Sequence, residues 1–156
     1  MNIEQRIKAF NRANPPFYLV EHDDGTFSLC LAFSFLRGKY AGFGQDAFNQ
    51  YAKQIGEPVK EDGFYTHGNG YEWESVFKKA FEKTPNISKI RFDCEAGGFF
   101  CYSRDLSVLE DLGSQFRKIC LDKNGFAELV CTALEEAVIQ DEEEKQCLTR
   151  VIGEKI

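Results

Sequence analysis

The stretch FYLVEHDDGTFSLCLAF, residues 17–33, constrains the fold most, because mainly apolar residues flank a short polar segment that contains an Asp-Gly pair. Apolar residues that recur with period two are typical of β-strands. The pair Asp24-Gly25 suits a type I′ turn, because both central residues of that turn need positive φ. The stretch therefore predicts two antiparallel strands joined by a tight turn.

The turn also predicts which residues face each other. A two-residue turn at Asp24-Gly25 pairs Val20 with Leu29 and sets Leu19 beside Cys30. Because side chains alternate between the faces of a strand, the apolar face of the second strand should hold Phe27, Leu29, Leu31 and Phe33.

A second hairpin is predicted over residues 87–103, which include RFDCEAGGFFCYS. With Gly97-Gly98 as a two-residue turn, Cys94 lies opposite Cys101. Period two then gives a core face of Ile90, Phe92, Cys94, Phe99 and Cys101, and an opposite face of Arg91, Asp93, Glu95, Phe100, Tyr102 and Arg104. The thiols and the carboxylates point in opposite directions, which disfavours a metal site built from both.

Apolar residues at helical spacing predict five helices, over residues 3–13, 46–55, 71–84, 105–121 and 125–140. Asn69 is a good N-cap for the third helix, and Glu72 stands at the capping-box position. Residues 34–45 remain unassigned and residues 56–70 predict a loop. The acidic run 141–144 indicates a solvated or fraying end, after which a short amphipathic turn (Leu148, Val151 and Ile152) could fold back.

Hairpins segregated from helices indicate an α+β fold, and 156 residues suit a single domain spanning 1–156. The 15 Phe residues bring apolar area without a polar group, so most of them should be buried. A net charge of −6 argues against nucleic-acid binding, which needs clustered Lys and Arg. We expect a cytoplasmic protein, since no run is long enough to span a membrane and the N-terminal residues are polar.

Few residues suggest chemistry. The six cysteines match no zinc spacing and are expected to be reduced thiols in the core. The two histidines, His22 and His67, have no nucleophile motif beside them, and the HGNG stretch indicates a helix N-cap or an anion site. The sequence therefore predicts no metal and no cofactor.

The exposed face of the second hairpin leaves three interpretations open. Asp93 and Glu95 lie two apart on a strand, about 7 Å along it. They could form a solvated face neutralised by arginines, a catalytic acid and base, or a recognition surface with Phe100 and Tyr102.

Two motifs stand out in the middle of the chain. The first is a Gly-aromatic-acidic-Trp entry into a helix, here Gly70 to Trp73 within HGNGYEW. The second is a strand reading Phe-Asp-x-Glu-Ala, here Phe92 to Ala96, with aromatics Phe99 and Phe100 just after it. With the Leu-rich helix that follows, they resemble the immunity protein 51 family of bacterial polymorphic toxin systems, and the resemblance covers about residues 17–122.

The resemblance implies a protein that binds a cognate toxin, encoded by an adjacent gene, and neutralises it without catalysis. The expected contact residues are Asp93, Glu95, Phe100 and Tyr102, and the expected structural motif residues are Gly70, Trp73, Phe92 and Phe99. No nucleic acid and no membrane is expected as partner, and the oligomeric state stays open. A small carboxylate-dependent enzyme and a scaffold or interaction domain without a toxin are the alternatives.

Overall fold

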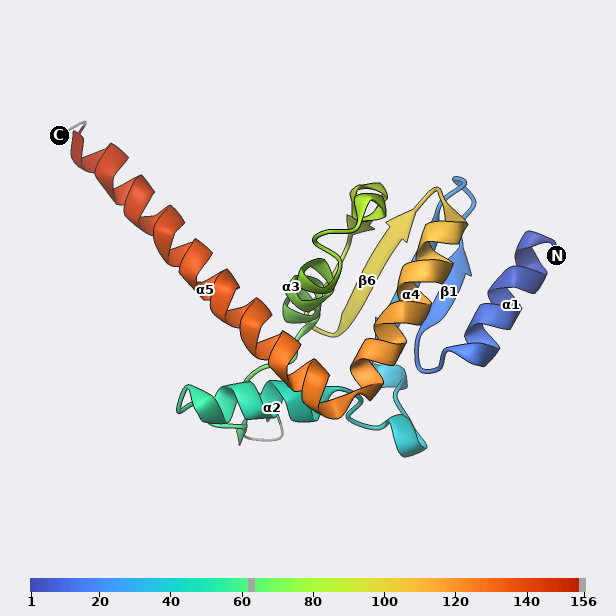
Figure 1. Cartoon of the computed structure of the whole chain (residues 1–156), viewed down its shortest axis with the longest axis horizontal. Helices are drawn as coiled ribbons and strands as arrows, with labels where there is room; N and C mark the ends of the chain where they lie inside the picture. Colours follow the sequence, from blue (N-terminus) through green and yellow to red (C-terminus); the bar gives the residue numbers. More distant parts are fainter. Residues whose placement is uncertain (62–63, 155–156) are drawn as a thin grey trace.

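A computed structural model of the chain describes residues 1–61 and 64–154, which form helices packed against an antiparallel sheet (Figure 1). The α-helices are α1 (Ile3–Ala13), α2 (Gln45–Gln54), α3 (Gly70–Ala80), α4 (Leu106–Leu121) and α5 (Lys123–Glu154). The strands are β1 (Tyr18–Glu21), β2 (Phe27–Ala32), β3 (Lys60–Glu61), β4 (Phe64–Tyr65), β5 (Arg91–Phe92) and β6 (Gly98–Ser103). Short 3-10 helices are η1 (Phe33–Phe35), η2 (Gly38–Tyr40) and η3 (Pro85–Lys89). The α+β prediction is confirmed.

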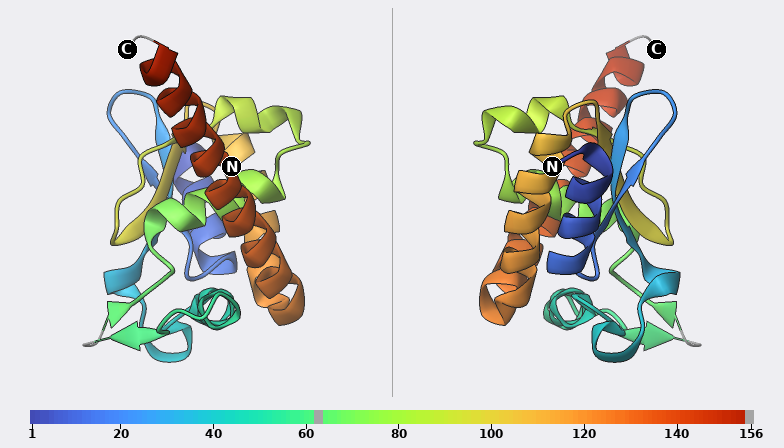
Figure 2. Two further views of the ribbon diagram at one scale, coloured as in Figure 1. Left: turned by 90° about the vertical axis from the view of Figure 1, so that its left-hand side faces the viewer. Right: turned by 90° about the vertical axis from the view of Figure 1, so that its right-hand side faces the viewer.

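The two predicted hairpins join into one four-stranded antiparallel sheet in the order β1-β2-β6-β5. The contact between them is the pairing of β2 with β6, in which Leu29 lies opposite Cys101. Helices α1, α3 and α4 lie on one side of the sheet, which we call the inner face, and the two views of Figure 2 show the strands on the opposite side of the molecule from α4. The other side, which we call the outer face, is not covered by an α-helix of the described residues.

The core beneath the inner face is rich in phenylalanine. Phe77 of α3 contacts Phe99 of β6 and Phe116 of α4, with ring centroids 5.2 Å and 5.0 Å apart. Trp73 packs between Phe43, Phe48 and Phe126 and is 1% exposed. These rings bury a large apolar area and fix α3, α4 and the start of α5 against the sheet.

The register of the first hairpin differs from the prediction by one residue. Tyr18 pairs with Cys30 and Leu19 with Leu29, because a three-residue loop replaces the two-residue turn. The loop is closed by the His22 N–H donating to the Thr26 carbonyl (2.9 Å), and Gly25 supplies its positive φ of 84°. The shift moves Leu19 away from Cys30 and onto the inner face, where it is buried.

The second hairpin differs by two residues, so its faces are kept. Phe92 pairs with Cys101, and the bridge between Glu95 and Gly98 leaves Ala96-Gly97 as the turn. Gly98 belongs to β6, where it pairs with Ala32 of the neighbouring strand β2. The predicted Gly97-Gly98 turn was therefore wrong, because pairing between the hairpins holds Gly98 in the sheet.

The first four helix predictions are confirmed with small changes at the ends. Asn2 forms a capping box with Gln5 at α1, and Asp105 caps α4. Helix α2 begins at Gln45, one residue before its predicted start, and its N-cap is Gly44. The predicted loop over residues 56–70 contains the short hairpin β3–β4 on both sides of residues 62 and 63, which lie outside the described part.

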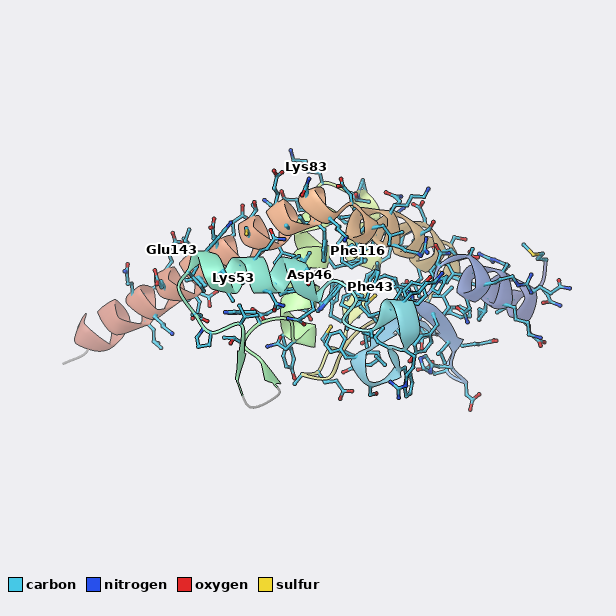
Figure 3. All side chains as sticks on the ribbon, turned by 90° about the horizontal axis from the view of Figure 1, so that it is seen from below. Phe43, Asp46, Lys53, Lys83, Phe116 and Glu143 are labelled. Carbon is cyan, nitrogen blue, oxygen red and sulfur yellow. The ribbon has the colours of Figure 1, made fainter. Side chains whose placement is uncertain are left out.

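Helix α5 corrects the prediction for the C-terminal segment. Instead of ending near residue 140, the helix continues through the acidic run and projects from the body (Figure 1). Residues 142–146 are good helix formers, and residues 141–146 include no Gly or Pro, so nothing in the chain stops the helix there. Glu143 lies on the projecting half in Figure 3, and Leu148 is exposed rather than folded back. The side chains of Val151 and Ile152 lie outside the described residues.

Candidate functional site

The exposed side of the β5–β6 hairpin separates thiols from carboxylates, as the alternation predicts. Asp93 and Glu95 are exposed on the outer face, whereas Cys101 is buried on the inner face. Cys94 is half-buried, and its sulfur accepts the Phe100 N–H (3.4 Å), while the Phe100 carbonyl accepts the Asp93 N–H (3.0 Å). The outer face is therefore the surface on which the predicted contact residues lie.

Two of those residues share a cavity. Asp93 and Tyr102 line an open cavity of about 490 Å³, which we call the polar cavity. Its remaining walls come from the β1–β2 hairpin and from β5, namely His22, Asp24, Thr26, Ser28 and Phe92. Tyr102 is 37% exposed, so its ring presents apolar area and a hydroxyl group to a partner.

The other two predicted contact residues lie outside the polar cavity. Glu95 sits at the Ala96-Gly97 turn, exposed to solvent. Phe100 is half-buried beside Gly98, where a Cβ would come within 2.6 Å of the Phe100 ring. The polar cavity therefore holds only one of the two carboxylates, whereas a glycosidase-like acid and base would both face the same site.

A serine–histidine contact in the polar cavity was missed by sequence reasoning. His22 Nε2 lies 2.6 Å from Ser28 Oγ, next to the loop of the first hairpin. Among the described residues, no hydrogen bond holds the second ring nitrogen of His22, which the activation of a serine nucleophile requires. Only the correct register brings these two side chains together, and the sequence pattern predicts a different one.

The carboxylate of Asp24 is also fixed in this cavity. It accepts hydrogen bonds from the Thr26 hydroxyl (2.6 Å) and the Thr26 N–H (3.0 Å). These bonds favour the charged form and lower the pKa of Asp24 below its usual value. The cavity therefore carries fixed negative charge beside the exposed Asp93.

The structural motif residues lie next to this surface. Gly70 begins α3, and its N–H points at the Ala96 carbonyl (3.4 Å) of the hairpin turn. A Cβ on Gly70 would overlap the carbonyl oxygens of Gly98 and Glu95, so only glycine permits this approach. Phe92 and Phe99 pack on Phe77 from the same hairpin.

The HGNG stretch builds a polar cluster at the start of α3. Asn69 caps the helix by accepting the Glu72 N–H (2.9 Å). The Glu72 carboxylate accepts the Gly68 N–H (2.8 Å) and contacts His67 Nδ1 (2.7 Å), while His67 Nε2 contacts Glu57 (2.7 Å). Burial opposes the charge on His67, but the hydrogen bonds that its ring donates to the two carboxylates prevail and raise its pKa above 6.5. A carboxylate of the chain itself therefore occupies this helix terminus.

The thiols are poor nucleophiles where they are buried. All six cysteines are free, and burial raises the pKa of Cys30 to about 12 and that of Cys94 to about 11. Within residues 1–61 and 64–154, no three His, Cys, Asp or Glu side chains gather in a way that could hold a metal ion. None of the described helices has an apolar stretch long enough to cross a membrane.

Comparison with known proteins identifies one family. No curated protein and no solved structure matches the chain. The family model of immunity protein 51 matches residues 17–135, from the strand β1 region to the point at which α5 leaves the body. This range includes both hairpins, the Gly70–Trp73 helix entry and α4, and it extends the predicted resemblance by the first part of α5. The chain therefore belongs to the immunity protein 51 family.

Proposed function

We propose that this protein binds a toxin protein encoded by an adjacent gene and neutralises it by covering its functional surface, without a reaction of its own. The observation that carries the proposal is the family match over residues 17–135. Six free cysteines favour the reducing cytoplasm as the place of action.

We further propose the outer face as the contact surface, with Asp93, Glu95, Phe100 and Tyr102 as contact residues. Support comes from the exposure of both carboxylates next to the partly exposed aromatic rings. Charged residues at an interface mainly raise the association rate and set specificity, whereas buried aromatic anchors supply most of the affinity. The fixed carboxylate of Asp24 extends this acidic surface, which suits a toxin with a basic cleft.

Co-expression with the product of the neighbouring gene tests the function itself. Cells that produce the toxin together with this chain should survive, and the two proteins should co-purify as a complex. Cell death at the rate seen without this chain would refute the proposed function.

Charge reversal tests the surface. Asp93→Lys with Glu95→Lys should weaken toxin binding by about tenfold or more, mainly through a slower association rate. A matched control is Glu128→Lys with Glu135→Lys, which changes the net charge equally at two exposed positions on α5. Equal toxin affinity for both folded double variants would remove the outer face from the proposal.

A further inference from the structure

A second cavity adjoins the polar cavity on the same side of the sheet. It has a volume of about 540 Å³ and shares Asp24, Thr26 and Tyr102 with the polar cavity. Its remaining lining residues are Ser88, Lys89, Arg91, Ser103, Arg104 and Asp105. We call it the arginine cavity. The three shared residues place the two cavities side by side at this end of the sheet, and we call the pair together the groove.

Two guanidinium groups in the arginine cavity keep most of their hydrogen-bonding capacity. Arg91 donates from Nη1 to the Ser88 carbonyl (3.2 Å), and Arg104 donates from Nη1 to the Asp24 carbonyl (3.3 Å). Each guanidinium has five N–H donors. Both contacts go to backbone carbonyls, which hold the side chains without neutralising their charge.

Neither arginine forms an ion pair with another described residue, which distinguishes them from the other cations nearby. Lys89 lies 3.4 Å from the Asp105 carboxylate, and Arg6 pairs with Glu110 elsewhere on the surface. The Asp24 carboxylate is held by Thr26 rather than by Arg104. Arg91 and Arg104 thus line one cavity without an ion-pair partner among the described residues, although the charge of Arg104 also favours the ionised Asp24 carboxylate in the same lining.

The sheet register explains why the two arginines converge. Arg91 lies opposite Tyr102 on the neighbouring strand, and Arg104 follows Tyr102 by two residues. Residues two apart along a strand point to the same face, so Arg91 and Arg104 are both neighbours of Tyr102 and line the same cavity. Paired or forked N–H donors are the arrangement that recognises a planar oxyanion.

We infer that the arginine cavity binds a carboxylate side chain of the toxin, clamped by Arg91 and Arg104. This inference rests on the proposed function. The balance of three cations against two carboxylates in the lining leaves one net positive charge, which one carboxylate satisfies. A polyanion such as nucleic acid would meet the carboxylates of Asp24 and Asp93 in the same groove.

The clamp also sets the orientation of the partner. The groove has carboxylates at Asp93 and Asp24 in one cavity and guanidinium groups in the other. A toxin surface that docks here presents a basic group to the polar cavity and an acidic group to the arginine cavity. The reverse orientation would place like charges together at both ends, which is disfavoured.

The test removes the two charges without reversing them. Arg91→Gln with Arg104→Gln should weaken toxin binding by about a hundredfold, largely through faster dissociation, and each single variant by about tenfold. The control is Arg12→Gln with Lys118→Gln, which changes the net charge equally at exposed helix positions and should bind as the wild type does. Thermal unfolding of all variants checks that the fold is kept.

The outcomes separate the inference from the proposed function. Wild-type protein that does not bind the toxin refutes the proposed function, and with it this role of the cavity. Wild-type binding that the folded double variant retains unchanged overturns the clamp alone. Binding of a single-stranded oligonucleotide by the wild type that is lost in Arg91→Gln with Arg104→Gln would assign the cavity to phosphate and overturn the carboxylate assignment.

Discussion

The inner and outer faces of the four-stranded sheet are made by the same strands, but their side chains differ in burial and in chemical character. Leu29, Leu31 and Phe99 on the inner face are completely buried. The residues beside them in the chain, Ser28 and Phe100, are half-buried on the outer face. Because alternate residues belong to opposite faces, one strand can change its recognition surface without changing its core.

The contrast teaches where stability and binding are encoded. The inner face is held by ring-to-ring contacts across β6, α3 and α4, and these contacts tolerate little change in volume. The outer face carries hydroxyl, imidazole, carboxylate and guanidinium groups around two open cavities. Substitutions on the two faces should therefore have separable consequences.

The largest effect is expected on the inner face at Phe99. Phe99→Ala removes a ring that contacts Phe77 and Phe116 and leaves a cavity, which should cost about 3–5 kcal/mol of unfolding free energy. Tyr102→Ala, three residues along on the outer face, should cost about 1 kcal/mol or less. Urea denaturation measures both. If Phe99→Ala does not fold, Phe99→Leu provides the smaller measurable loss, and equal costs at the two positions would contradict the division between faces.

A second prediction concerns the contact that joins α3 to the outer hairpin. Gly70→Ala forces a methyl group into the backbone carbonyls of Gly98 and Glu95, so the helix must move away, at about 1–3 kcal/mol. Gly97→Ala is the control, because a Cβ there meets no atom within 4 Å. Equal unfolding midpoints for the two variants would show that this close approach does not limit stability.

A third prediction concerns the cluster of His67 with Glu57 and Glu72. Unlike the polar groups of the outer face, this cluster is expected to stabilise the fold. The folded-state pKa of His67 lies above 6.5, so the folded state binds the proton more tightly than the unfolded chain. Its stabilising contribution is complete below pH 6.5 and is lost as the pH rises through the folded-state value. Unfolding free energy measured between pH 6 and pH 9 should fall less steeply in His67→Gln than in the wild type, and identical slopes would contradict the assignment.

The division between faces could be predicted from the sequence because it depends only on local alternation. Asp93 and Cys101 were assigned to opposite faces even though the predicted register of their hairpin was wrong by two residues. An error of two preserves the faces, whereas the error of one in the first hairpin moved Leu19 to the other side. The local sequence pattern therefore predicts the face on which a side chain lies more safely than it predicts the residue opposite it on the neighbouring strand.

The groove could not be predicted, because it depends on contacts between distant segments. The pairing of β2 with β6 places Ser28 opposite Tyr102, and this neighbourhood follows from tertiary packing rather than from either hairpin. The contact of His22 with Ser28 needs a three-residue loop where the sequence favours a two-residue turn. The length of α5 was also missed, since an acidic run indicates charge repulsion but does not break a helix.

The smallest effect on stability is expected from the acidic residues of the outer face. Asp93→Lys with Glu95→Lys should change the unfolding free energy by no more than about 0.5 kcal/mol, because neither side chain forms an ion pair with a described residue and both are exposed. Reversing two charges in a chain of net charge −6 also reduces overall repulsion slightly. Urea denaturation in low salt measures the difference. A loss of several kcal/mol would mean that these carboxylates stabilise the fold, and it would contradict the conclusion that substitutions on the two faces have separable consequences.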